Sequence, residues 1–269
     1  MSARKPLTAA TADRHWLYEN SVQNVDWETG FLDTAYRRVF KRPATFLRED
    51  FCGTAALSCA WVKRHARNVA LGVDLHGPTL AWGRRHNVSP LGAASLRVRL
   101  VQDDVRHVRR PRADILAATN FSWWTFKTHA DLLAYLRNCY RSLRNDGMLA
   151  LDIYGGPEAQ VTQQEERRCA GFSYFWDQAA FNPITHAYRC HIHFAFPDGT
   201  ALRRAFSYDW RLWSVPEVRE LLQAAGFAET AVYWEGTDRN GQPSGIFRPG
   251  TLGDAAPAWV AYVIAYRRG

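Results

Sequence analysis

Acidic residues stand at the ends of three successive apolar segments in the first half of this 269-residue sequence. The first segment ends in Arg48-Glu49-Asp50 and runs into Cys52-Gly53-Thr54-Ala55, the second ends in Asp74, and the third ends in Asp103-Asp104. A carboxylate accepts hydrogen bonds from ribose hydroxyls or from the amino group of a purine, and a glycine lets a ligand lie against bare main chain. The pattern therefore predicts a site for an adenosyl-like ligand.

A parallel sheet is the element that would bring these acids together. Short apolar runs alternate with longer helical patterns between residues 44 and 156, as in ATFLRED followed by TAALSCAWVKRHAR, and NVALGVDL followed by GPTLAWGRRHN. Near-continuous apolar strands joined by crossover helices are typical of a parallel sheet that is covered on both faces. Open sheets of this kind bind ligands at the carboxyl ends of their strands, where the acids would lie.

The segments on either side of this pattern predict additional elements. Residues 16–40 have mixed helical spacings, which indicate two short helices with a break at Glu28-Thr29-Gly30. After residue 156, the runs THAYRCHIHFAF and ALRRAFSYDW alternate with period two around Pro197-Asp198-Gly199-Thr200, which is a hairpin signal. Ser214 and Gly226 suit the start and the end of a later helix, and two last strands flank a loop rich in glycine and proline.

With these motifs the chain resembles the class I S-adenosylmethionine-dependent methyltransferases. In that family a turn of the type (Asp/Glu)-x-Gly-x-Gly-x-Gly holds the methionyl group, an acid after the second strand holds the ribose, and an acid after the third marks the adenine. Glu49 and Asp50 are alternatives for the first acid. Two residues depart from the pattern: Phe51 stands where the first glycine is common, which suggests a bulkier wall under the ligand, and Ala55 stands at the third.

The resemblance implies a Rossmann-like α/β fold, with a seven-stranded, mostly parallel sheet and helices on both faces. It also implies an N-terminal helical lid over residues 1–43 and a methyltransferase domain over residues 44–269. An antiparallel insertion after the fifth strand would occupy about residues 165–212.

S-adenosyl-L-methionine is the cofactor that the resemblance implies, and the strand ends and the turn would bind it. Arg48 has two possible roles: its side chain could pair with the methionyl carboxylate, or it could form a surface salt bridge. The predicted cofactor-binding residues are Arg48, Glu49, Asp50, Cys52, Gly53, Thr54, Asp74, Leu75, Asp103, Asp104, Val105, Asn120 and Phe121.

The segment ATNFSWWTFKTH follows the fourth strand, where the family places residues that face the methyl acceptor. Its amide and hydroxyl groups can hydrogen-bond at the strand end, and its aromatic rings can either surround a cation or simply cover the sheet edge. The leading helices would add an aromatic residue from the lid. The candidate catalytic residues are Tyr18, Asn120, Ser122, Trp124 and Tyr154.

Composition limits the other functions. The net charge of +8 comes mostly from arginines spread along the chain, which favours an ordinary soluble surface over a nucleic-acid site. No apolar run is long enough to span a membrane, no secretory signal is recognisable, and the five scattered cysteines fit reduced thiols in a cytoplasm. We expect no metal, because His191 and His193 have no recognisable third ligand.

The sequence thus predicts methyl transfer to a small-molecule acceptor, at an amine nitrogen or an oxygen, by a cytoplasmic protein for which a homodimer stays open. A nicotinamide-dependent dehydrogenase is disfavoured, because no second glycine follows Gly53 until Gly72. Three alternatives remain: an RNA methyltransferase, an adenosylmethionine cyclase or lyase, and a protein that only senses the cofactor.

Overall fold

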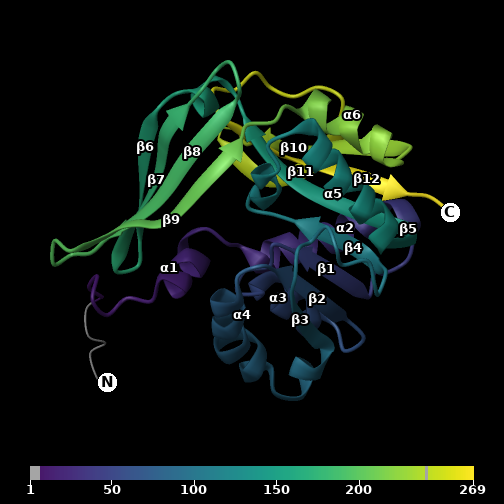
Figure 1. Cartoon of the computed structure of the whole chain (residues 1–269), viewed down its shortest axis with the longest axis horizontal. Coiled ribbons are helices and arrows are strands. Elements are labelled where there is room, and N and C mark those ends of the chain that lie inside the picture. Colours follow the sequence, from purple (N-terminus) through teal and green to yellow (C-terminus); the bar gives the residue numbers. More distant parts are fainter. Residues whose placement is uncertain (1–6, 240–241) are drawn as a thin grey trace.

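One eight-stranded sheet forms the centre of the computed structural model, which describes residues 7–239 and 242–269. Its strand order is β11-β10-β12-β5-β4-β1-β2-β3 (Figure 1). Strands β1 to β5 pair in parallel, whereas β12 is antiparallel to both of its neighbours, β5 and β10. The strands are β1 (Phe46–Asp50), β2 (Val69–Asp74), β3 (Val98–Gln102), β4 (Ala113–Ala118), β5 (Leu143–Gly155), β10 (Glu229–Thr237), β11 (Pro243–Gly250) and β12 (Trp259–Arg267).

The predicted Rossmann-like sheet is therefore confirmed, including its antiparallel strand from the C-terminal segment. The eighth strand, β11, pairs antiparallel with β10 and comes from the segment that the sequence suggested to be a loop. The glycines and prolines of this segment made it look like a loop. Such residues are tolerated in a strand at the edge of a sheet, which is the position of β11.

Helices cover both faces of this sheet. Side chains of α2 and α3 pack on one face together with Leu47 and Ile115, while those of α5 and α6 pack on the other with Leu116 and Leu149. The helices are α1 (Arg14–Ser21), α2 (Val25–Phe40), α3 (Ala56–Arg64), α4 (Gly77–Gly83), α5 (His129–Ser142) and α6 (Val215–Ala225), with short turns η1 (Arg84–Val88), η2 (Ser89–Arg97), η3 (Ser122–Thr125) and η4 (Pro157–Gln160). Helix α6 has the predicted Ser214 cap and ends at Gly226. No helix in the described ranges is long and apolar enough to cross a membrane.

The two leading helices are separated at a different place from the predicted one. Helix α1 ends at Ser21, and the Asn24 side chain caps α2 by accepting a hydrogen bond from the backbone N–H of Trp27. Glu28-Thr29-Gly30 lies inside α2, so the predicted break there is wrong. The cap decides the boundary, because it satisfies a backbone donor that the first helical turn leaves free.

A second, four-stranded antiparallel sheet stands beside the first in the order β6-β7-β8-β9 (Figure 1). Its strands are β6 (Gln163–Cys169), β7 (Phe172–Phe181), β8 (Ala187–Ala195) and β9 (Ala201–Arg211). The predicted antiparallel insertion is thus present, with two more strands than the single hairpin that the alternation indicated. Helix α1 packs against this sheet through Leu17, which lies in one buried cluster with Phe172 and Ile192.

A buried ion pair fixes the end of β1. Arg48 and Asp50 are both fully buried, with 2.6 Å between Arg48 Nε and Asp50 Oδ1. The guanidinium also donates to the backbone carbonyls of Val105 and Val108, and Tyr135 donates its hydroxyl hydrogen to Asp50. Every partner lies inside the protein, so the pair joins β1 to α5 and to the loop after β3.

Replacing Arg48 by methionine would leave a buried carboxylate without its cation. We expect Arg48→Met to lower the free energy of unfolding by about 3–5 kcal/mol in urea titrations. The exposed pair between Lys127 and Asp209, at 2.7 Å, provides the control, and Lys127→Met should change the free energy by less than about 1 kcal/mol. Similar small losses in both variants would contradict a structural role for the Arg48–Asp50 pair.

Candidate functional site

The turn between β1 and α3 has an unusual backbone. Phe51, Gly53 and Ala55 have φ angles of 56°, 52° and 60°, so every second residue is left-handed. These are the three positions where the methyltransferase turn commonly has glycine, which adopts this conformation without steric cost. Two of them hold residues with side chains, at a cost on the order of 1–3 kcal/mol each. The turn thus keeps the glycine-type geometry with only one glycine.

Gly53 is the open point of this turn. A Cβ atom placed there would meet only the Thr79 methyl group within 4 Å, at 3.9 Å, so the space next to Gly53 is open. Phe51 does not line that space from below as predicted. Its ring packs against Phe126 and Tyr135 in the core, with ring centroids 5.9 and 5.7 Å away.

Asp74 ends β2 directly beside Gly53. Its Oδ2 accepts the Gly53 backbone N–H at 2.8 Å, and its Oδ1 accepts that of His76 at the same distance. The carboxylate is therefore oriented by two backbone donors at the carboxyl edge of the sheet. Leu75 follows it with 65% of its surface exposed, which leaves an apolar side chain free to cover a flat ring.

The loop after β3 holds the third pair of acids. Asp103 donates its N–H to the Asp74 carbonyl, so the two strand ends are joined. The Asp104 carboxylate binds Arg106 at 2.7 Å, and hydrogen bonds from Arg106 lower the pKa of Asp104 despite its partial burial. Asp103 is about half exposed, and Val105 is buried. Asp103 is thus the acid with the more accessible carboxylate.

Other predicted cofactor residues lie under the turn rather than at its surface. The guanidinium of Arg48 is fully buried and already paired, which rules out the surface salt bridge and commits its donors to protein acceptors. Glu49 accepts two hydrogen bonds from Ser58, at the start of α3. The Cys52 side chain is buried against Gly72, so only the backbone of Cys52 takes part in the surface of the turn. For these residues the geometry supports a role in holding the turn.

Three carboxyl groups are buried on α2, β1 and β5. Burial raises the pKa of Glu28 to about 7, that of Glu49 to about 8 and that of Asp152 to about 8. The charge of Glu28 raises the pKa of the other two further, so Glu28 lies within electrostatic range of both. A cationic ligand near these carboxyl groups would be stabilised by their ionised forms.

Helix α1, the predicted lid, contacts the turn through a hydrogen bond. Glu19 accepts hydrogen bonds from the Thr54 hydroxyl at 2.5 Å and from the Asn87 amide at 2.6 Å. Asp13, which caps α1, accepts a hydrogen bond from the indole of Trp82 at 2.6 Å. The lid therefore contacts the turn and α4 with side chains that the sequence did not single out.

The loop after β4 carries the predicted acceptor-side residues. Asn120 and Phe121 are both left-handed, with φ of 57° and 56°, and Asp152 accepts the Phe121 N–H at 3.0 Å. Ser122 donates its hydroxyl hydrogen to the Thr119 carbonyl. Trp124 is fully buried and stacks on Tyr154, with ring centroids 4.9 Å apart. Ser122 and Trp124 therefore support the loop and do not line the cavity beside it.

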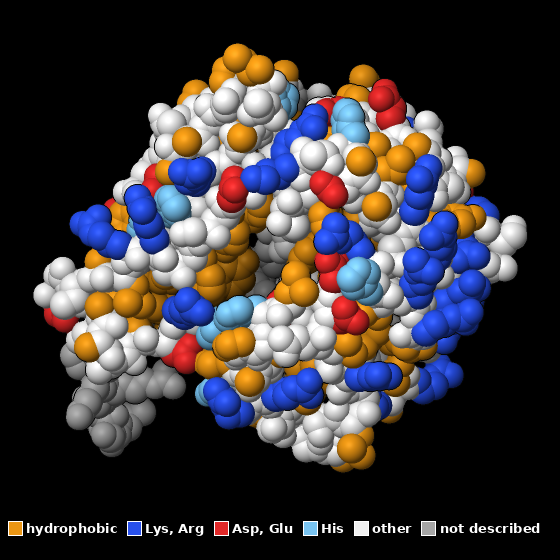
Figure 2. All heavy atoms as spheres, viewed as in Figure 1, with side chains coloured by type: hydrophobic (Ala, Val, Ile, Leu, Met, Phe, Trp, Pro, Cys, Tyr) orange, Lys and Arg blue, Asp and Glu red, His pale blue; other side chains and the backbone are white. Residues whose placement is uncertain are grey.

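That cavity, which we call the acceptor cavity, has a volume of about 490 Å³. It lies between the lid, the loop after β4 and the β6–β9 sheet, and Figure 2 shows a hollow with mostly hydrophobic walls between that sheet and the main body. Of the predicted residues, Tyr18, Asn120, Phe121 and Tyr154 line it. The other lining residues with aromatic or charged side chains are Tyr174, Trp176, Tyr208, Trp210, Trp259, Glu158, Glu165, Glu235 and Arg167.

Several of these lining residues were missed by the sequence analysis although a signal was present. The motif Tyr-x-Trp occurs at Tyr174–Trp176 on β7 and again at Tyr208–Trp210 on β9, which places both pairs on one face of the second sheet. Glu28 shares the buried face of α2 with Leu32 and Tyr36, at helical spacing. The signal for Glu28 is an acid at a position where the helical spacing predicts an apolar residue. No group of three or more metal-ligating side chains occurs within the described residues.

Comparisons with known proteins agree with this geometry. A methyltransferase domain model matches residues 50–151. The fold is similar to that of an S-adenosylmethionine-dependent methyltransferase from Clostridium acetobutylicum (TM-score 0.68, 13% identity, 95% of this chain and 98% of that one). It is also similar to an amino pentose methyltransferase of calicheamicin biosynthesis from Micromonospora echinaspora (0.65, 17%, 94% and 95%), and to a sugar N-methyltransferase from Streptoalloteichus (0.64, 19%, 100% and 97%). No curated protein matches the chain by sequence.

Open parallel sheets bind ligands at the carboxyl edge of their strands, and the strand-end acids of this chain lie at that edge. The domain match over residues 50–151 and the shared fold make this chain similar to S-adenosylmethionine-dependent methyltransferases, so S-adenosylmethionine is the cofactor against which its residues are tested. Two features fit this group: a Cβ atom at Gly53 would meet only one atom within 4 Å, and the Asp74 carboxylate accepts the Gly53 N–H directly beside it. The binding roles of the individual residues stay predictions.

Asp74 allows the most direct test of the cofactor site. A carboxylate that accepts hydrogen bonds from both ribose hydroxyls contributes about 3 kcal/mol, so Asp74→Ala should weaken S-adenosylhomocysteine binding roughly 100-fold in isothermal titration calorimetry. Asp103→Ala serves as a comparison and should cost less, because only one adenine contact is lost. Unchanged affinity in a folded Asp74→Ala variant would refute the assignment.

The raised pKa values predict that cofactor binding releases protons. The folded protein keeps Glu28, Glu49 and Asp152 protonated above their ordinary range, so their contribution to stability is present at low pH and is lost as the pH rises through about 7 to 8. A bound sulfonium favours the ionised forms, and S-adenosylmethionine should therefore bind more tightly as the pH rises from about 6 to 8. Calorimetry at pH 7 in two buffers of different ionisation enthalpy measures this release, which Glu28→Gln should reduce. Equal heats in both buffers would contradict the prediction.

Proposed function

We propose that this protein transfers the methyl group of S-adenosylmethionine to an amine nitrogen of a small molecule. The observation that carries the proposal is the lining of the acceptor cavity, in which aromatic rings surround the space and carboxylates outnumber cations three to one. Aromatic faces attract a cation by about 0.5–2 kcal/mol, and carboxylates add to that attraction. The same carboxylates disfavour a polyanionic acceptor such as RNA.

The aromatic face is built from two strands. Tyr208 and Trp210 stack with ring centroids 4.3 Å apart, and Trp176 lies 6.2 Å from Trp210. Tyr18 from the lid packs 5.0 Å from Phe206 and so faces the same sheet. This arrangement supports an acceptor that enters between the lid and the second sheet, with the methyl donor above Gly53.

The bound cofactor would supply an electrophilic methyl group on a positively charged sulfur. The chain would hold the neutral amine in line with that methyl group and exclude water. Transfer forms a carbon–nitrogen bond, breaks the carbon–sulfur bond and leaves S-adenosylhomocysteine, and one proton leaves the amine.

Tyr154 and the carboxylates have different parts in handling that proton. The Tyr154 hydroxyl donates to the Tyr188 hydroxyl, and burial raises the pKa of Tyr154 well above its ordinary value. It therefore stays protonated at neutral pH and serves as a wall rather than a base. Among the described residues that line the acceptor cavity, Glu158, Glu165 and Glu235 are the groups able to accept a proton.

Amino sugars are the first acceptors to test, because sugar N-methyltransferases occur among the proteins with this fold. Purified protein is incubated with S-adenosylmethionine carrying a labelled methyl group, together with a panel of amino sugars and the same sugars with hydroxyl in place of the amine. We expect label in products of the amines, and mass spectrometry locates it on nitrogen. Label only in oxygen-methylated products, or consumption of the cofactor without an acceptor, would contradict the proposal.

Trp176 separates acceptor binding from cofactor binding. Trp176→Ala removes one aromatic face, so kcat/KM for an amine acceptor should fall about 2- to 30-fold, while the affinity for S-adenosylhomocysteine stays unchanged. Trp176→Phe keeps an aromatic face and should retain most of the activity. If Trp176→Ala and the unaltered protein use the acceptor equally well, the cavity is not the acceptor site.

A further inference from the structure

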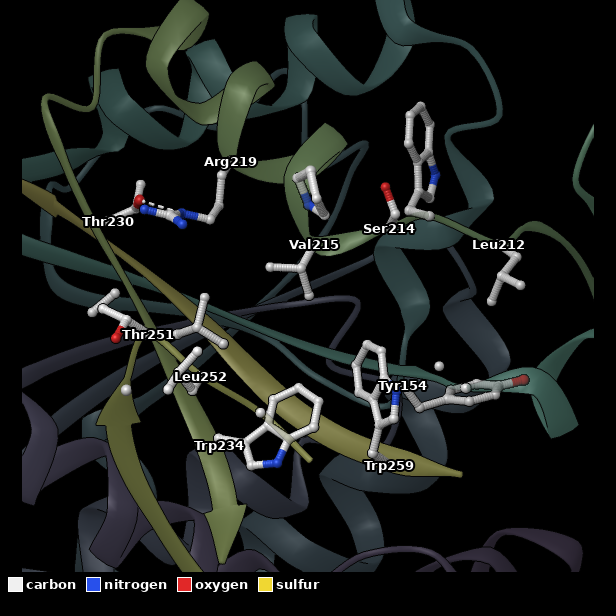
Figure 3. A pocket seen from close by; sticks show the side chains of 18 of the residues that line it. Tyr154, Leu212, Ser214, Val215, Arg219, Thr230, Trp234, Thr251, Leu252 and Trp259 are labelled. Carbon is white, nitrogen blue, oxygen red and sulfur yellow. Dashed lines mark hydrogen bonds between the residues drawn. The ribbon is translucent and has the colours of Figure 1, made fainter. Parts of the chain in front are cut away.

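A second cavity, which we call the α6 cavity, adjoins the acceptor cavity at Tyr154 and Trp259. Its volume is about 700 Å³, within the range of about 300–1,000 Å³ that is usual for small-molecule sites. Figure 3 shows its walls: the start of α6, strand β10 and the segment after β11 surround the space. Tyr154 and Trp259 are the lining residues that the two cavities share.

Flat aromatic surfaces form one side of the α6 cavity. Trp234 and Trp259 lie next to each other with ring centroids 4.7 Å apart, as the close view in Figure 3 shows. Gly155 of β5 lies against the Trp259 indole, since a Cβ atom there would overlap it. Both indoles remain partly exposed, and Leu252, another lining residue, is 90% exposed. Apolar groups of this size left open to water favour a flat apolar ligand.

One charged side chain accompanies these apolar walls. Arg219 extends from α6 to β10, where its Nε donates to the Thr230 hydroxyl at 3.0 Å (Figure 3). This bond uses one of five guanidinium N–H groups and fixes the side chain at one end of the cavity. None of the described lining residues is Asp or Glu. The cavity therefore pairs an apolar body with a single positive charge, the reverse of the acidic acceptor cavity.

We infer that the α6 cavity is a second small-molecule site, which takes a flat apolar or aromatic ligand that carries one anionic group. The indoles would contact the flat body of the ligand, and Arg219 would bind its carboxylate, sulfonate or phosphate. The inference stands on the lining residues of this cavity and does not depend on which group accepts the methyl.

The probe pair 2-naphthalenesulfonate and 2-naphthalenemethanol tests this inference, because the two share the ring system and differ in charge. In calorimetry of the full chain, we expect both to bind and the sulfonate to bind more tightly. Arg219→Gln should weaken sulfonate binding about three- to fivefold and leave the alcohol unchanged, since the arginine is exposed and its ion pair is weak. Trp234→Ala should weaken both probes at least about tenfold.

Two controls keep the test specific. Arg141→Gln removes another exposed helical arginine that does not line the cavity, and it should leave both affinities unchanged. Trp234→Phe retains a ring if the alanine variant fails to fold. No binding of either probe, equal losses for both probes in Arg219→Gln, or the same loss in Arg141→Gln would overturn the inference. It would also be overturned if sedimentation showed a dimer of the chain that Trp234→Phe or Arg219→Gln dissociates, because the cavity would then be an interface.

Discussion

The turn from β1 to α3 has a constrained backbone, in which Phe51, Gly53 and Ala55 are left-handed. The contacts that hold this backbone organise the elements around it. Such a conformation persists only where the surroundings determine it. Here the Arg48–Asp50 ion pair fixes the strand before the turn, Ser58 binds Glu49 beneath it, and the Asp74 carboxylate accepts its central N–H. Side chains from two strands and one helix thus hold a stretch of main chain open at Gly53.

The lid and the second sheet depend on the same turn. Glu19 of α1 binds Thr54, and α1 packs on the β6–β9 sheet through Leu17 and Tyr18. The position of the acceptor cavity therefore follows from contacts that begin at the turn. Two cavities of opposite character meet at Tyr154 and Trp259: one has aromatic rings and acids, and the other has indoles and an arginine.

Local sequence rules predicted the parts of the fold that depend on periodicity and strand-end chemistry. The acids at Asp74 and Asp103-Asp104, the Ser214 cap and the parallel sheet all follow from short-range patterns. The errors arose where tertiary packing decides. Arg48 looked available to a ligand until its burial beside Asp50 was known, and Trp124 looked like a cavity wall although it lies behind Tyr154. The roles of Glu19 and Glu28 could not be predicted from the sequence, because they depend on tertiary contacts. Glu19 accepts a hydrogen bond from Thr54, and Glu28 raises the pKa of Glu49.

A crystal structure of the protein with S-adenosylhomocysteine is the measurement that bears most directly on the central claim, that strand-end acids and bare main chain at Gly53 hold the adenosyl group. The account predicts ribose hydroxyls on Asp74, the adenine beside Leu75 and Asp103, and the amino-acid tail over Gly53 above the buried carboxyl groups. A ligand bound elsewhere, with protein side chains folded into the space above Gly53, would contradict it.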